Sequence, residues 1–271
     1  MKRLIFVLLL LAAVAPASRV RSRTIRILNI GNSLTENAIE QGLHELALEG
    51  GDTLLIGDCY RPEQSLAAYW REAENEEHKI EYRKIACGVR TTEYGRSLRE
   101  CLRDEPWDYI VFQQSIPESG VPESYEPALA CLIEYAKILA TNPEVRFGFH
   151  QTWAYARNAK HKGFARYADD QQIMFRAIRW ASAAAACRHD ALCLLIPCGE
   201  AIQRLRATRM GDNFCDDGCH LNAAGRYAAA CTWLVMLTGQ DPARSTYKPA
   251  EVAEKDALLI RREVARAVRR Q

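Results

Sequence analysis

Short apolar runs rich in β-forming residues alternate with longer helical patterns along this chain, and that alternation restricts the folds open to it. Polar or glycine-containing turns follow most of the short runs. This order is typical of a parallel sheet with helices on both faces. We therefore predict an α/β fold, a three-layer α/β/α sandwich with a mostly parallel five-stranded sheet. The five predicted strands are residues 24–30, 53–56, 109–112, 146–149 and 192–196.

Two further kinds of pattern complete the predicted fold. Residues 79–93, KIEYRKIACGVRTTE, alternate apolar and polar side chains, and this period predicts a hairpin added to the edge of the sheet. Apolar residues at helical spacing predict the helices. These are residues 36–49, 63–76, 97–103, 124–140, 168–186, 201–207, 223–237 and 250–269.

The N-terminus has the pattern of a secretory signal. Two cationic residues precede an apolar run of eleven residues, 4–14, and the small-residue sequence Ala-Pro-Ala ends at Ala17. A membrane-spanning helix needs about 20 apolar residues, so we expect cleavage after Ala17 rather than stable membrane insertion. The remaining residues, 18–271, are expected to form a single domain that is secreted or periplasmic.

Charge and cysteine content limit the partners and the compartment. Removing Lys2 and Arg3 with the signal lowers the formal net charge from +2 to 0, and the remaining charges are interleaved. We therefore expect no nucleic-acid partner, and a partner that is neutral or small. The chain has ten cysteines, and in an oxidising compartment some of them are expected to form disulfides whose pairing the sequence leaves open.

Candidate binding residues follow four of the predicted strands. Ser33 follows the first strand, Gly57 the second and Gln113 with Gln114 the third; His150 and Trp153 follow the fourth. In open α/β sheets, ligands bind outside the carboxyl ends of the strands. These positions therefore predict one shared site, in which His150 and Trp153 could bind substrate. Exposed loops are often polar, and a buried structural role for both residues remains an alternative.

A second segment supplies the groups that would activate a serine. In DDGCHLNAAGRYAAA, Asp217 lies three residues before His220, in a polar loop that leads into a helix. A serine becomes a nucleophile when a histidine takes its proton, and a carboxylate orients that histidine. Asp217 and His220 could also be ordinary turn and helix-entry residues, and Ser33 an ordinary helix cap.

Taken together, these motifs resemble the SGNH, or GDSL, hydrolase superfamily, and in particular an uncharacterised secreted bacterial branch of it. IGNSLTENA, LLIGDCY and DDGCHLNAAGRYAAA resemble its first, second and last blocks. The resemblance implies a flavodoxin-like SGNH hydrolase fold with Ser33 as nucleophile, Asp217 as acid and His220 as base. It also implies that the amides of Ser33 and Gly57 donate to the oxyanion.

The third block departs from that superfamily. WDYIVFQQSIPESG lacks the Gly-x-Asn expected after the third strand. A side-chain amide is still present, and an oxyanion donor is typically worth about 3–4 kcal/mol of barrier. We predict Gln114 for this role, with Gln113 as the alternative because strand alternation points only one of them at the site.

These features predict a secreted serine esterase. The resemblance implies a small-molecule or glycan ester as substrate, and suggests a carbohydrate O-acetylesterase. No metal or other cofactor is expected, because the six histidines show no zinc-type spacing. A G-x-S-x-G elbow is absent from the sequence, which argues against an ordinary α/β-hydrolase. Two alternatives remain at this stage: a non-catalytic glycan-binding protein on the same fold, and a lipase or acyltransferase with the same three residues.

Overall fold

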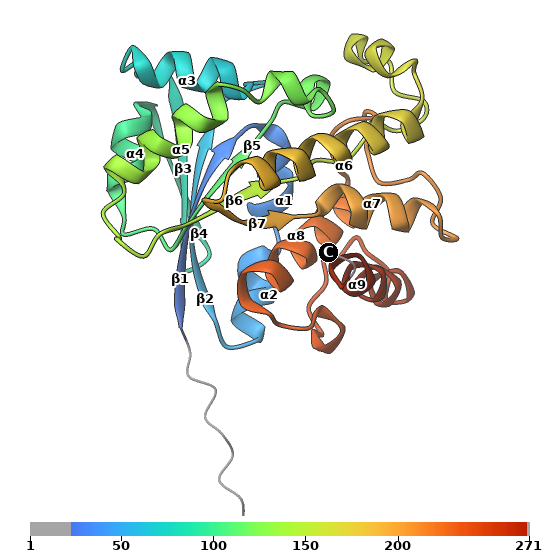
Figure 1. Ribbon diagram of the computed structural model, residues 1–271. Helices are drawn as coiled ribbons and strands as arrows, with labels where there is room; N and C mark the ends of the chain where they lie inside the picture. Colours follow the sequence, from blue (N-terminus) through green and yellow to red (C-terminus); the bar gives the residue numbers. More distant parts are fainter. Residues whose placement is uncertain (1–22, 270–271) are drawn as a thin grey trace, which may run out of the picture.

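A seven-stranded sheet forms the middle layer of the computed structural model, which describes residues 23–269 (Figure 1). The strands are β1 (Thr24–Gly31), β2 (Thr53–Tyr60), β3 (Ile80–Ala86), β4 (Val89–Arg96), β5 (Tyr109–Gln113), β6 (Arg146–His150) and β7 (Leu192–Ile196). Their order across the sheet is β4-β3-β2-β1-β5-β6-β7. Strands β2, β1, β5, β6 and β7 are parallel to one another, whereas β3 pairs antiparallel with β2 and β4 pairs antiparallel with β3.

The predicted fold class is confirmed, but the predicted number of strands is wrong. The five predicted strands are the parallel ones, and the hairpin expected at 79–93 adds β3 and β4 at one edge. Cys87 and Gly88 join these two strands with φ values of 50° and 76°. Positive φ at both central residues is what a tight two-residue hairpin turn requires. The predicted signal peptide, 1–17, lies outside the described residues.

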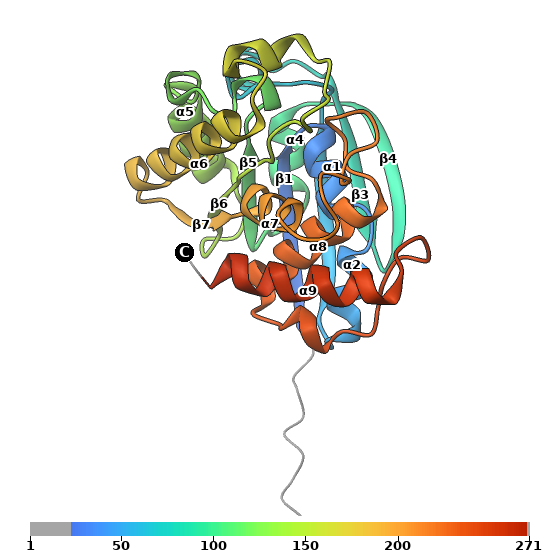
Figure 2. The same ribbon diagram turned by 90° about the vertical axis from the view of Figure 1, so that its right-hand side faces the viewer.

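Helices cover both faces of the sheet (Figures 1 and 2). The helices of one face are α3 (Leu66–Glu74), α4 (Leu98–Asp104) and α5 (Ala128–Leu139). Those of the other are α1 (Ser33–Ile39), α2 (Leu43–Glu49), α7 (Cys198–Arg206), α8 (Ala223–Thr238) and α9 (Glu254–Val268). Helix α6 (Gln171–Arg188) packs beside the edge strand β7. One helix was predicted at 36–49, and Gly42, with a φ of 85°, divides it into α1 and α2.

Strand β1 shows how the core is divided between the two faces. Ile25 and Ile27 are buried against the layer that contains α1, α2 and α8, whereas Leu28 and Ile30 are buried against α3, α4 and α5. A strand covered on both faces has to be apolar on both, which explains the continuous apolar run in the sequence. Among residues 23–269, no helix is long and apolar enough to cross a membrane.

One polar cluster lies at the buried junction of β1, β2 and β3. Asn29 Nδ2 donates to Asp58 Oδ1 at 2.8 Å, and Arg83 forms ion pairs with Glu40 at 3.2 Å and Glu81 at 2.7 Å. Burial, and then the charge of Glu40, raise the pKa of Asp58 well above its usual range. The native protein therefore keeps this carboxyl protonated at a pH where the unfolded chain has lost the proton.

The raised pKa predicts that replacing Asp58 by Asn changes how stability depends on pH. Above the unfolded pKa of about 4, native Asp58 binds the proton that the unfolded chain releases, so the unfolding free energy of the wild type falls as pH rises. Asp58→Asn removes this loss and keeps an oxygen acceptor for Asn29. We expect the variant to gain stability relative to the wild type between pH 5 and pH 8, measured by urea unfolding.

The exposed residue Asp190 provides the control for this experiment. Asp190→Asn should shift the unfolding free energy equally at both pH values. A wild-type-to-Asp58→Asn difference that stays constant from pH 5 to pH 8 would contradict the protonated state of Asp58.

Candidate active site

The turn after β1 presents Ser33 at the first position of α1. Asn32 caps this helix, because its Oδ1 accepts the Leu34 amide at 3.1 Å. Gln113, at the end of the neighbouring strand β5, holds the same turn through its Oε1. That oxygen accepts from the Asn32 amide at 3.1 Å and from Thr35 Oγ1 at 2.8 Å. The hydroxyl of Ser33 is thus fixed at the carboxyl edge of the sheet.

The loop before α8 folds back on itself around Asp217. Its Oδ1 accepts the amides of Cys219 at 2.9 Å and His220 at 2.7 Å, and its Oδ2 accepts from His220 Nδ1 at 2.6 Å. Gly218 has a φ of 87°, a backbone conformation that suits glycine. The carboxylate therefore both shapes the loop and fixes the orientation of the imidazole.

The two segments meet at a hydrogen bond between Ser33 and His220. Ser33 Oγ donates to His220 Nε2 at 2.9 Å. A second bond supports the contact: the amide of Leu221 donates to Asn37 Oδ1 at 2.7 Å. Asn37 lies one helical turn after Ser33, so α1 holds both Ser33 and the loop that carries His220. The structure brings together the three residues that the sequence predicted as a triad.

The carboxylate of Asp217 is stabilised in its charged form. Partial burial raises the pKa of Asp217, but hydrogen bonds from the His220 side chain and from the amides of His220 and Cys219 outweigh this effect and lower the pKa to about 2. Asp217 therefore stays ionised at neutral pH. It can orient the His220 ring and stabilise the imidazolium that forms when Ser33 loses its proton.

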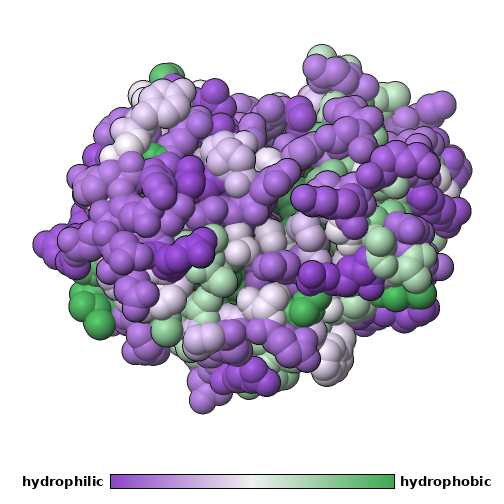
Figure 3. All heavy atoms as spheres, turned by 90° about the horizontal axis from the view of Figure 1, so that it is seen from above, coloured by the Kyte–Doolittle hydropathy of each residue, from purple (hydrophilic) through white to green (hydrophobic). Residues whose placement is uncertain are grey.

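A cavity of about 310 Å³ opens beside Ser33 and His220. Figure 3 shows the molecule from the side where the parallel strands end, and hydrophilic side chains cover most of this face. The cavity walls combine apolar, acidic and basic side chains from five separate segments of the chain. The lining residues are Asn32, Ser33, Leu34, Glu63, Ile116, Pro117, Lys160, His161, Asp217, Cys219 and His220.

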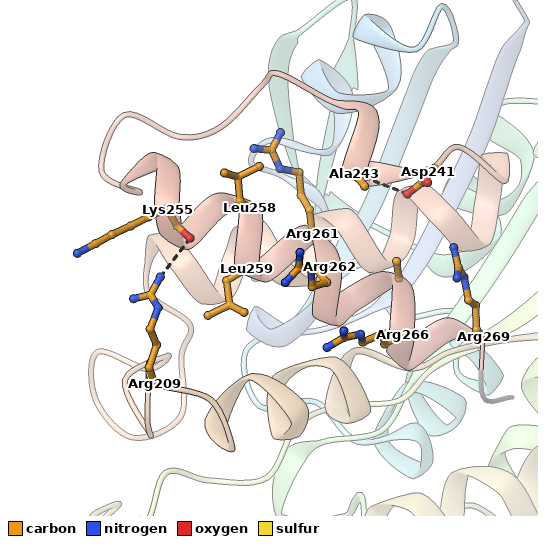
Figure 4. A pocket seen from close by; sticks show the side chains of 11 residues that line it. Arg209, Asp241, Ala243, Lys255, Leu258, Leu259, Arg261, Arg262, Arg266 and Arg269 are labelled. Carbon is orange, nitrogen blue, oxygen red and sulfur yellow. Dashed lines mark hydrogen bonds between the residues drawn. The ribbon is translucent and has the colours of Figure 1, made fainter.

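A larger cavity, of about 540 Å³, lies along α9 (Figure 4). Its lining includes Arg262, Arg266 and Arg269, and it shares no residue with the cavity at the triad. Among residues 23–269, Asp241 is its only lining acid, and no histidine or serine lines it. This cavity lacks a nucleophile and a base, so the smaller one is the candidate active site.

Comparison with known proteins places the chain in a family. Residues 26–267 match the family model described as Domain of unknown function (DUF4886). This chain belongs to the DUF4886 family. A crystal structure of a DUF4886 family protein from Bacteroides uniformis is 36% identical, with a TM-score of 0.88 over 90% of this chain and 95% of that one. No curated protein matches the sequence.

More distant structures share the fold. A protein from Slackia heliotrinireducens that is assigned to the SGNH hydrolases is 23% identical, with a TM-score of 0.55 over 79% of this chain and 98% of that one. A protein from Parabacteroides merdae described as GDSL-like lipase is 13% identical, with a TM-score of 0.52 over 80% and 97%. The DUF4886 protein is therefore related in fold to the SGNH superfamily, as the sequence motifs suggested.

The structure contradicts the predicted role of Gly57 in this DUF4886 protein. Gly57 lies in the middle of β2, paired with Leu28, and β2 continues to Tyr60. The three residues between Gly57 and the strand end span about 10 Å, so its amide is not at the site. The loop after β2 lies there instead: Asn32 Nδ2 donates to the Gln64 carbonyl at 3.1 Å, and Glu63 lines the cavity.

The two glutamines predicted as oxyanion donors are also engaged elsewhere. Gln114 Nε2 donates to Ser124 O and to Ser124 Oγ, both at 3.0 Å, and its Oε1 accepts the Leu66 amide. Gln113 Nε2 donates to the carbonyl of Gln114. Both predictions are therefore wrong, because these amides tie together the loops around the site. Of the predicted donors, the Ser33 amide remains, and it has no acceptor among the described residues.

His150 and Trp153 are not substrate-binding residues. Both are fully buried, and burial lowers the pKa of His150 to about 3, so this histidine is neutral. Its ring packs against Trp153 and Trp233. Trp153 Nε1 donates to the carbonyl of Cys219 at 2.8 Å and so supports the loop that carries His220. The predicted binding residues are core residues with a positioning role.

The cysteines do not form the expected disulfides. All ten lie within the described residues and all are free thiols. Cys219 lines the active-site cavity, and burial together with the charge of Asp217 raises its pKa to about 12. A thiol in this state is a poor nucleophile, so Ser33 is the nucleophile that the cavity offers. Within residues 23–269, no cluster of three or more His, Cys, Asp or Glu side chains could hold a metal ion.

The sequence patterns did not predict every residue that shapes the candidate site. Asn37 could have been found, because it lies four residues after Ser33 on the same helix face. Glu63 and His161 gave no comparable signal: they lie in loops after β2 and β6, at positions where a polar residue is ordinary. Their place in the cavity depends on how those loops fold.

Replacing Gly57 by Ala distinguishes a packing role of this residue from the predicted role as an oxyanion donor. A Cβ at this position would lie 2.7 Å from Trp107 Cη2 and 3.0 Å from Leu28 Cδ1. Because the site is fully packed, we expect Gly57→Ala to lower the unfolding free energy by about 1–3 kcal/mol. The folded variant should keep the catalytic rate of the wild type. Urea unfolding and ester hydrolysis below the unfolding transition measure the two effects. Wild-type stability with a large loss of rate would restore the oxyanion role of Gly57.

Proposed function

We propose that this DUF4886 protein is a serine esterase. One observation carries the proposal: Ser33 Oγ, His220 and Asp217 form a continuous chain of hydrogen bonds, of 2.9 Å and 2.6 Å, at the mouth of a cavity. A serine, a histidine and a carboxylate in this order transfer a proton away from the serine and back. The arrangement suits acyl transfer and requires no cofactor.

The proposed reaction has two stages. Ser33 Oγ attacks the ester carbonyl while His220 Nε2 takes its proton, and the carbonyl oxygen becomes an oxyanion near the N-terminus of α1. The free amide of Ser33 is a donor for this oxyanion. The bond to the alcohol then breaks, and His220 returns the proton to the leaving alcohol. Water, deprotonated by His220, releases the acid from the acyl-Ser33 intermediate and restores the hydroxyl.

We further propose that the natural substrate is an O-acetylated carbohydrate. A cavity of about 310 Å³ is at the small end of the range for ligand sites, which favours a short acyl group. Glu63, Lys160 and His161 in its wall favour a hydroxylated alcohol over a lipid chain. Acetate release from acetylated xylan, pectin and sialosides would test this choice, and a preference for long-chain esters would favour a lipase.

The proposed site of action is the periplasm or the cell exterior, with residues 1–17 removed. The cationic start, short apolar run and Ala-Pro-Ala sequence support this proposal. N-terminal sequencing of the exported protein should begin at Ser18. A chain that keeps Met1 in the cytoplasm would contradict it.

The triad predicts how three substitutions affect hydrolysis of p-nitrophenyl acetate. Ser33→Ala and His220→Ala remove the nucleophile and the base, so we expect the catalytic rate to fall by about 10⁶. Asp217→Asn weakens orientation of the imidazole and should lower the rate by about 10⁴. A fluorophosphonate reagent should label the wild type at Ser33, detected by mass spectrometry.

Ser97 supplies a matched serine control. Its hydroxyl caps α4, on the other face of the sheet from α1. Ser97→Ala should cost about 1 kcal/mol of stability and leave hydrolysis unchanged. Equal, negligible hydrolysis by the wild type and Ser33→Ala would rule out the esterase and favour a glycan-binding protein.

A further inference from the structure

His161 is the second histidine of the active-site cavity, and its protonation pattern is fixed by its neighbours. It caps the short 3-10 helix at Lys162–Tyr167, because its Nδ1 accepts the Gly163 amide at 3.0 Å. An amide N–H can only donate, so Nδ1 carries no proton. The neutral ring then has its proton on Nε2.

Tyr155 reinforces this tautomer. Its hydroxyl lies 2.7 Å from the same Nδ1, and the two rings stack at 5.0 Å between centroids. Burial raises the pKa of Tyr155 well above its usual range, so the hydroxyl stays protonated and donates to Nδ1. Tyr155 is itself fully buried. Two donors therefore converge on one nitrogen, and the other, Nε2–H, has no acceptor among the described residues.

Glu63 adds a hydrogen-bond acceptor to the cavity that contains the donor of His161. It lies in the loop after β2, with a φ of 53°, and its carboxylate has no ion pair or hydrogen bond within residues 23–269. Glu63 lines the cavity together with His161 and Cys219. One cavity thus contains a free acceptor and a free donor beside Ser33.

We propose that His161 and Glu63 bind the alcohol part of the substrate through its hydroxyl groups. His161 Nε2–H donates to one hydroxyl oxygen, and the Glu63 carboxylate accepts from a hydroxyl hydrogen. A polyhydroxylated alcohol such as a sugar satisfies both groups, whereas a phenol or a simple alkyl alcohol, once esterified, has no hydroxyl left to offer. This inference rests on the proposed esterase activity and assigns the residues that select its substrate.

The test compares two acetate esters that differ in their alcohol. His161→Asn removes Nε2–H but keeps a side-chain oxygen that can cap the Gly163 amide, because Asn is a favourable N-cap residue. We expect kcat/KM for a monoacetylated methyl glycoside to fall about tenfold or more, as for a lost hydrogen bond to substrate. The value for p-nitrophenyl acetate, which offers no hydroxyl, should stay within about twofold to threefold.

Variants of Glu63 and of Lys162, the residue after His161, complete the experiment. Glu63→Ala should lower kcat/KM for the glycoside ester by a similar factor and change p-nitrophenyl acetate hydrolysis little. Glu63→Gln keeps an acceptor oxygen and should lose less. The control is Lys162→Ala. Lys162 is exposed, lies next to His161 and does not line the cavity, so this variant should leave kcat/KM unchanged for both esters.

The outcomes separate this inference from the proposed function. If His161→Asn affects both esters equally, or neither, the histidine does not select the alcohol and the inference is overturned, although the triad still stands. If the wild type hydrolyses neither ester and Ser33→Ala is identical to it, the esterase itself fails. Circular dichroism and thermal unfolding of His161→Asn check that the variant keeps the fold and stability of the wild type, including the 3-10 helix at Lys162–Tyr167.

Discussion

The hydrogen bond from Ser33 to His220 joins two segments that lie 187 residues apart, and the architecture of the site depends on it. Each segment is shaped locally before they meet. Asn32 caps α1 and fixes Ser33, and Asp217 accepts two backbone amides of its own loop and fixes His220. Preorganisation of both partners reduces the entropy lost when they are brought together. The bond from Leu221 to Asn37 then locks the loop onto the helix that carries the nucleophile.

The order of the sheet explains why these segments converge. The described chain enters the middle of the sheet with β1, moves outward through β2, β3 and β4 to one edge, and then crosses back to β5 on the other side of β1. Ligand sites of doubly wound sheets form where the strand order reverses in this way. Ser33 follows β1 and Gln113 ends β5, so the turn with the nucleophile is held from the neighbouring strand. The loop before α8 reaches the same edge because α8 packs against α1.

Much of this arrangement could be predicted from the sequence, and the failures at Gln113, Gln114 and His150 share one cause. Strands were recognisable because burial on both faces requires continuous apolar runs, and the triad because serine, aspartate and histidine occur in distinctive local motifs. Side-chain contacts between loops leave no such pattern. Gln113 and Gln114 follow a strand as an oxyanion donor would, but their amides are used by neighbouring loops. His150 likewise ends a strand, yet its side chain points into the core.

Loops supply the other side chains that shape the cavity around Ser33, Asp217 and His220. Ser33, Asp217 and His220 are held by caps and backbone amides that leave little freedom for change. Glu63 adopts a left-handed conformation, which costs about 1–2 kcal/mol for a residue with a Cβ and is readily adopted by glycine. Strain of this kind is typical of functional sites. Under the proposed function, a glutamate here supplies an acceptor beside Ser33 that glycine could not supply, so the strained conformation has a use in the wall of the cavity.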